Sequence, residues 1–170
     1  MIQKYTYGTP FETDAIVTSI PASEGTPAYG TISTENGFSF TYDMDDNDVV
    51  YGLGESNRGI NKRGYVYESN CSDQPNHTED KISLYGAHNF LVISGKQTFG
   101  LFVDYPGKLK FDIGYTLSSQ LKITCEDADL YLYVIEGETP YDIVKQFRKI
   151  IGRSYIPPKF AFGFGQSRWG

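Results

Sequence analysis

The sequence predicts an all-β protein built as a β-sandwich, and three observations carry this prediction. Tyr, Phe and Gly are abundant, with 14, 11 and 18 copies among 170 residues, and these residues are typical of twisted strands and tight turns. Short stretches alternate between apolar and polar side chains. They also recur at regular intervals, which is typical of a sandwich. The predicted strands are 37–42, 48–53, 64–68, 90–94, 98–103, 108–113, 121–124 and 128–135.

The clearest hairpin joins strand 90–94 to strand 98–103 through Gly95 and Lys96. Glycine there is expected to provide the positive φ that a tight turn needs. One helix follows the last strand. Thr139 is its predicted N-cap, Pro140 fits its first turn and Gly152 closes it. Its apolar stripe, which should pack on the sandwich or a neighbouring part, consists of Ile143, Val144, Phe147, Ile150 and Ile151.

The last part of the chain predicts the start of another structural unit. Pro157 and Pro158 indicate a stiff linker, and residues 160–169 alternate like a buried aromatic strand. An isolated strand of this kind cannot satisfy its backbone groups, so we expect the rest of a sheet beyond Gly170. The predicted division is a sandwich over 1–138, a helix and linker over 139–158, and the start of a truncated unit over 159–170.

Charge and composition exclude several classes of partner. The net charge is −6, with 15 dispersed basic residues against 21 acidic ones, whereas nucleic-acid binders cluster Lys and Arg. The apolar stretches are far shorter than the roughly 20 residues of a membrane span. The amino terminus lacks the apolar segment of a secretory signal, so we expect a cytoplasmic protein. Cys71 and Cys125 are then expected to be reduced thiols.

Several segments resemble known functional motifs but lack residues that those motifs require. Gly52-Leu-Gly54 lacks the third glycine of a dinucleotide fingerprint and is interpreted as a turn at a strand end. The acidic run 43–48 lacks the glycine of a calcium loop and is predicted to be a solvated hairpin tip. His77 and His88 have no further ligands at metal-binding spacing. No metal, cofactor or nucleophilic triad is therefore predicted.

A long polar loop between two predicted strands, residues 69–81, is dense in groups that hydrogen-bond hydroxyls. Long ordered loops are often functional. From composition alone, a binding loop and a mobile surface excursion are equally good interpretations.

Five motifs in order resemble the amino-terminal region of glycoside hydrolase family 31, the family of α-glucosidases, α-xylosidases and relatives. The motifs are Tyr51-Gly-Leu-Gly-Glu55, Leu84-Tyr85-Gly86, Phe99-Gly-Leu-Phe-Val-Asp104, Glu136-Gly-Glu-Thr-Pro140 and Pro157-Pro-Lys-Phe-Ala-Phe-Gly-Phe-Gly-Gln-Ser-Arg168. The resemblance implies a galactose-mutarotase-like β-sandwich followed by a (β/α)8 barrel whose first strand is 160–169. Arg168 and Trp169 would then lie at the rim of the sugar pocket, where Trp169 stacks on a sugar or serves as a core aromatic.

Family members retain anomeric configuration through two aspartates on later barrel strands or loops. Neither is present here, so this chain alone is expected to be inactive, and no cofactor is implied. The partners that the resemblance implies are the missing barrel and, for the full-length enzyme, an α-linked oligosaccharide substrate.

The resemblance also implies that loop 70–80 reaches over the active-site entrance. Asp73 is the best candidate for a sugar contact, since a carboxylate accepts hydroxyl hydrogen bonds, and Gln74, Asn76 and His77 are weaker candidates. Glu55 and Arg58 are expected to form a structural pair near the base of the loop. Residues 83–90 depart from the family pattern, which bears on specificity.

Two function classes follow from these observations. The first is the front part of a retaining α-glycosidase, in particular an α-glucosidase that acts on short α-glucosides. The alternative is a stand-alone β-sandwich that binds carbohydrate or protein without catalysis. An aromatic strand after Pro157 and Pro158 favours the first, because a barrel needs such a strand and a stand-alone module does not.

Overall fold

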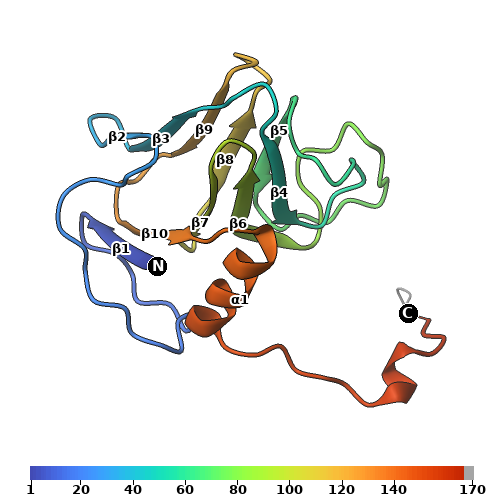
Figure 1. The fold of residues 1–170 in the computed structure, drawn as a ribbon. Helices are drawn as coiled ribbons and strands as arrows, with labels where there is room; N and C mark the ends of the chain where they lie inside the picture. Colours follow the sequence, from blue (N-terminus) through green and yellow to red (C-terminus); the bar gives the residue numbers. More distant parts are fainter. Residues whose placement is uncertain (167–170) are drawn as a thin grey trace.

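The structure, a computed structural model, describes residues 1–166 as two packed antiparallel sheets, one helix and a trailing segment (Figure 1). This confirms the predicted all-β sandwich. The first sheet has the order β1 (Ile2–Tyr7), β10 (Leu130–Glu136), β7 (Thr98–Asp104), β6 (Ala87–Ser94) and β4 (Val49–Gly54). The second has the order β2 (Thr31–Ser33), β3 (Phe38–Asp43), β9 (Gln120–Cys125), β8 (Leu109–Ile113) and β5 (Tyr65–Ser69).

The central strands β7 and β10 separate two apolar cores. Side chains of successive strand residues point to opposite faces, so Leu101 and Leu132 enter the core between the sheets. Phe102 and Tyr133 point the other way, into a second core beneath the helix. Both strands are therefore apolar on two faces, unlike β3 and β8, which bury only alternate residues.

The helix α1 (Pro140–Ile151) covers the outer face of the first sheet, as predicted. Thr139 and Asp142 form a reciprocal capping box at its amino terminus, which satisfies backbone donors that the helix leaves free. Ile143, Phe147 and Ile150 are buried, whereas Val144 from the predicted stripe is 41% exposed. The stripe is thus narrower than the sequence indicated.

Gly100 allows the helix to lie close to β7. A Cβ atom at this position would come within 2.4 Å of the Ile143 Cγ2 atom, a separation that real Cβ contacts do not reach. The small residue in the middle of a strand therefore has a packing reason.

All eight predicted strands are present, but two strands and two turns differ from expectation. β1 and β2 were not predicted, because β1 is an edge strand with only Tyr5 fully buried and β2 has only three residues. Gly95 does not adopt positive φ. It is glycine because a Cβ atom there would lie 2.0 Å from the Asp48 Oδ1 atom.

The acidic run 43–48 is not a hairpin tip, because β3 and β4 belong to different sheets. Asp48 at its end is only 2% exposed. Its carboxylate accepts hydrogen bonds from the Tyr42 hydroxyl at 3.1 Å and from the Asp45 backbone N–H at 2.9 Å. Burial with these donors explains the acidic residue without a metal ion.

The segment after the helix leads away from the sandwich (Figure 1). Lys159–Phe162 forms a short 3-10 helix rather than the predicted strand. No strand of the described residues pairs with it, and a strand without a partner leaves its backbone groups unpaired. The first barrel strand is therefore not confirmed, and the division at 138 and 158 stays a prediction.

Candidate functional site

The polar loop runs from Asn70 to Gly86 and connects β5 in one sheet to β6 in the other. Its two arms are hydrogen-bonded to each other and to β5. The Ser72 N–H donates to the Leu84 carbonyl at 3.0 Å, and the Glu68 N–H donates to the Ile82 carbonyl at 2.8 Å. The loop is thus tied internally rather than being a loose excursion.

Asp73 lies in a small cluster with two rings from the same loop. The Tyr85 hydroxyl donates to Asp73 Oδ1 at 2.5 Å, and the edge of the His77 ring meets the Tyr85 ring at a centroid distance of 5.4 Å. All three side chains are exposed. The hydrogen bond to the Asp73 carboxylate is the main cause that raises the pKa of Tyr85, because that bond favours the protonated phenol.

The second carboxylate oxygen of Asp73 has no hydrogen-bond partner within residues 1–166. An exposed carboxylate can accept several hydroxyl hydrogen bonds, and aromatic rings next to it offer apolar faces. Asp73, His77 and Tyr85 therefore have the chemistry to contact a sugar at the surface.

The other predicted site residues are not part of this cluster. Gln74 is half-buried and Asn76 is exposed, and neither side chain makes a hydrogen bond to the described part of the chain. Arg168 and Trp169 lie outside the described residues. Tyr85 was missed as a site residue, although it belongs to the Leu84-Tyr85-Gly86 motif.

Glu55 and Arg58 do not pair with each other, so that prediction is wrong. Each binds the backbone of the loop instead. The Gly86 N–H donates to Glu55 Oε2 at 2.9 Å, and the Arg58 guanidinium donates to the carbonyls of Val66, Glu79 and Asp80. Nearby carbonyls satisfy the arginine, which removes the need for a carboxylate partner.

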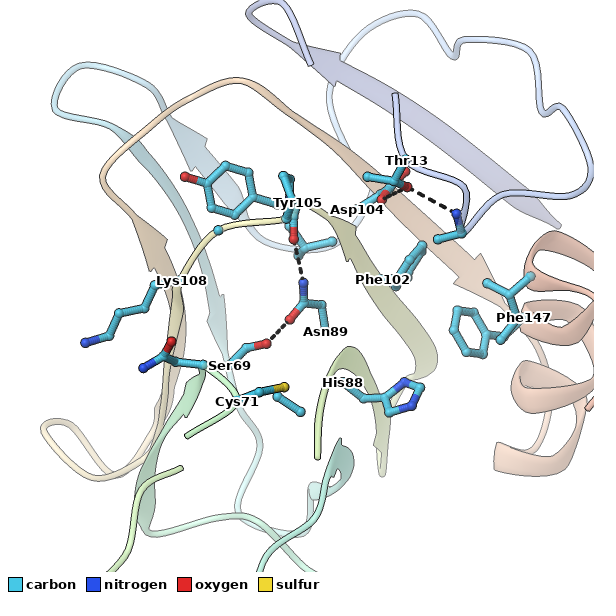
Figure 2. A pocket seen from close by; sticks show the side chains of 17 residues that line it. Thr13, Ser69, Cys71, His88, Asn89, Phe102, Asp104, Tyr105, Lys108 and Phe147 are labelled. Atoms are coloured by element: carbon cyan, nitrogen blue, oxygen red, sulfur yellow. Dashed lines mark hydrogen bonds between the residues drawn. The ribbon is translucent and has the colours of Figure 1, made fainter. Parts of the chain in front are cut away.

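A hollow of about 760 Å³ lies elsewhere, between the carboxyl end of α1 and the ends of β5, β6 and β7 (Figure 2). It was not predicted, and none of the predicted site residues of the described chain lines it. Its polar wall contains Asn89, whose amide donates to the Tyr105 carbonyl at 3.0 Å. Phe102 and Phe147 form its apolar side.

Asp104 at the upper edge of this hollow is only 5% exposed (Figure 2). The Thr13 hydroxyl donates to its Oδ1 atom at 2.7 Å. Burial is the main cause that raises the pKa of this carboxyl above its ordinary value of 3.8, and the Glu12 carboxylate adds to it. The sequence carried no signal for this, because an acidic residue at a strand end is usually solvated.

The substitution Asp104→Asn is expected to raise the melting temperature at pH 7. A carboxyl with a raised pKa binds more protons in the folded state, so stability falls as pH rises above 3.8 and through the raised pKa. Asn keeps an oxygen for Thr13 and carries no charge. The melting temperatures of the unmodified protein and Asp104→Asn, measured between pH 3 and pH 8, should converge at the acid end. A lower melting temperature of Asp104→Asn at pH 7 would contradict this prediction.

A family model described as the glycosyl hydrolase 31 N-terminal galactose mutarotase-like domain matches residues 9–112, more than half of the chain. The chain belongs to glycoside hydrolase family 31. The matched residues correspond to the amino-terminal domain of the family, which confirms the galactose-mutarotase-like sandwich.

Similar proteins in this family have named glycosidase activities. The chain is 31% identical over 145 residues to α-glucosidase 2 of Bacillus thermoamyloliquefaciens, which covers 79% of this chain and 18% of that protein. It is 27% identical to the α-xylosidase XylQ of Lactiplantibacillus pentosus, covering 71% of this chain and 15% of that protein. The chain therefore spans less than one fifth of the length of these family 31 relatives.

Solved structures of other proteins share the fold. A family 31 dextranase of Flavobacterium johnsoniae, in complex with isomaltotriose, matches with a TM-score of 0.71 and 25% identity. The match covers 78% of this chain and 16% of the dextranase. A cycloalternan-degrading enzyme of Trueperella pyogenes matches with a TM-score of 0.61 at 19% identity, which supports the fold alone.

The helices of residues 1–166 are too short or too polar to span a membrane. The same residues contain no group of three or more His, Cys, Asp or Glu side chains placed to hold a metal ion. The cytoplasmic location expected from the amino terminus stays a prediction.

Proposed function

We propose that this chain is the amino-terminal part of a retaining α-glucosidase that hydrolyses terminal α-glucosidic bonds in short oligosaccharides. The observation that carries the proposal is family membership over more than half of the chain, together with 31% identity to an α-glucosidase. The catalytic aspartates would lie on a barrel after residue 170, so the 170 residues alone would be inactive. The stand-alone binding module has less support, because the matching family model describes a domain of glycosyl hydrolases.

In this function, loop 70–86 would contribute to the entrance of the active site. Asp73 would accept hydrogen bonds from hydroxyls of the leaving-group sugar, with Tyr85 fixing one of its oxygens at 2.5 Å. His77 would line the same surface through its contact with Tyr85. Gln74, Arg168 and Trp169 stay candidates for sugar contacts from neighbouring positions.

The test is the activity of the full polypeptide purified from its source cells. Maltose, isomaltose, an aryl α-glucoside and an aryl α-xyloside are compared by kcat/KM, and the anomer first released is identified by NMR. We expect the glucosides to be preferred and the α-anomer to be released first, since two carboxyl groups about 5 Å apart give retention. A preferred xyloside, a β-anomer released first or no hydrolysis would contradict the proposal.

A further inference from the structure

One short segment, Glu55–Arg58, fastens loop 70–86 from outside. The Glu55 N–H donates to the Gly86 carbonyl at 2.7 Å, and the Gly86 N–H donates back to the Glu55 carboxylate at 2.9 Å. The Asn57 amide donates to the His77 carbonyl. Two residues of the segment therefore bind the loop at separate places along its length.

Arg58 makes two further contacts with the loop and one with β5. Its Nε donates to the Glu79 carbonyl at 2.7 Å, its Nη2 to the Asp80 carbonyl at 3.2 Å and its Nη1 to the Val66 carbonyl of β5 at 2.8 Å. The guanidinium also lies over the rings of Tyr65 and Tyr67, at 4.5 and 5.1 Å from their centroids. A planar, permanently charged group is suited to this combination of stacking and branched donation.

A bulge at the end of β4 places the segment against the loop. The register with β6 shifts between Gly52 and Gly54, and Leu53 between them has a φ of 68° although it is 8% exposed. A Cβ atom at Gly54 would lie 2.7 Å from the Gly86 carbonyl oxygen. Strained backbone of this kind persists only where the surroundings determine it, which indicates that the close approach of segment and loop is built into the fold.

We propose that Arg58 is a positioning residue for the leaving-group sugar, a role that rests on the proposed function of the loop. The guanidinium holds the 79–80 turn, and the Asn57 amide holds the backbone of His77. The His77 ring packs on Tyr85, and the Tyr85 hydroxyl fixes Asp73. Through the 79–80 turn, which follows His77 by two residues, Arg58 sets the orientation of the Asp73 carboxylate without touching the sugar.

The test compares Arg58→Met, Arg58→Lys and the control Arg63→Met in the full-length enzyme. Arg63 is a matched control because it also donates to several carbonyls, but these belong to Asp45, Asp46, Asp48 and Ser118 rather than to the loop. Amide hydrogen exchange is measured at Ser72 and Lys81, whose N–H groups are hydrogen-bonded within the loop, and at Gly86, whose N–H donates to the Glu55 carboxylate. Steady-state kinetics are measured on maltose and on an aryl α-glucoside.

Arg58→Met is expected to speed exchange at these amides by about tenfold or more, because several hydrogen bonds from a charged donor are lost. It should raise KM for maltose about three- to tenfold with little change in kcat, and leave the aryl glucoside unaffected. Arg58→Lys should show smaller increases in both the exchange rates and the KM for maltose than Arg58→Met. An ammonium keeps the charge over the rings but cannot reach three carbonyls. Arg63→Met should change neither.

Unchanged exchange in Arg58→Met would overturn the anchoring role. Faster exchange with an unchanged KM for maltose would overturn the positioning role, and so would equal effects of Arg63→Met. Failure of the proposed function is distinguishable from these outcomes, because the unmodified enzyme would then prefer a xyloside, release the β-anomer first or hydrolyse no substrate, while the exchange experiment still reports on the loop.

Discussion

Phe147→Ala is expected to lower the free energy of unfolding by about 3–5 kcal/mol, the usual cost of removing a large buried aromatic side chain. Phe147 is 6% exposed and stacks on Phe90 with ring centroids 3.8 Å apart. Its edge also meets Phe102 at 5.1 Å. Alanine would leave a cavity between α1 and the first sheet, because Ile143 and Ile150 are already packed on the strands.

Urea unfolding of the 170-residue chain measures this effect, with Val144→Ala as the control. Val144 lies on the same helix but is 41% exposed, so its substitution should change stability by less than about 0.5 kcal/mol. A loss of less than about 1 kcal/mol in the free energy of unfolding for Phe147→Ala, or a loss no larger than that of Val144→Ala, would contradict a stabilising role of the core beneath the helix.

The strands and the helix could be predicted because their signals are local. The strand at β8 buries alternate residues, and the helix carries both a cap and an apolar stripe. Period and capping are properties of a few consecutive residues, so one sequence suffices to detect them. β1 escaped prediction because its place is given by pairing with β10, more than 120 residues later in the chain.

The functional contacts were harder to predict because they join distant residues. Asp73 was predicted from the family resemblance, but its partner Tyr85 depends on how the loop folds back on itself. Glu55 and Arg58 were correctly placed at the loop base and wrongly paired, since opposite charge in the sequence does not reveal that backbone carbonyls lie nearer. The buried carboxylate of Asp104 accepts a hydrogen bond from Thr13, 91 residues away in the sequence.

The aromatic segment after Pro158 illustrates a different limit. Its alternation predicts a strand, yet Lys159–Phe162 is a 3-10 helix and Phe160 is 84% exposed. Strand formation requires hydrogen-bond partners as well as a suitable pattern. The alternating pattern therefore indicates that the segment is suited to a strand when partner strands are present. It does not predict the conformation of the segment in this chain.

The substitution Asp73→Ala in the full-length enzyme is expected to reduce kcat/KM for maltose by about tenfold to a hundredfold, the usual cost of losing hydrogen bonds to a charged group. Hydrolysis of an aryl α-glucoside should be unchanged, because its leaving group offers no hydroxyls to the carboxylate. The matched control is Asp127→Ala. Asp127 is also exposed and also accepts a hydrogen bond from a tyrosine hydroxyl, that of Tyr105 at 2.7 Å, but it lies between β9 and β10.

The most direct measurement is therefore the ratio of kcat/KM on maltose to kcat/KM on the aryl glucoside, for the unmodified enzyme, Asp73→Ala and Asp127→Ala. If loop 70–86 forms part of the leaving-group site, the ratio falls at least about tenfold for Asp73→Ala and stays constant for Asp127→Ala. An unchanged ratio for Asp73→Ala, or an equal fall for both substrates, would contradict a role of this loop in binding the leaving-group sugar.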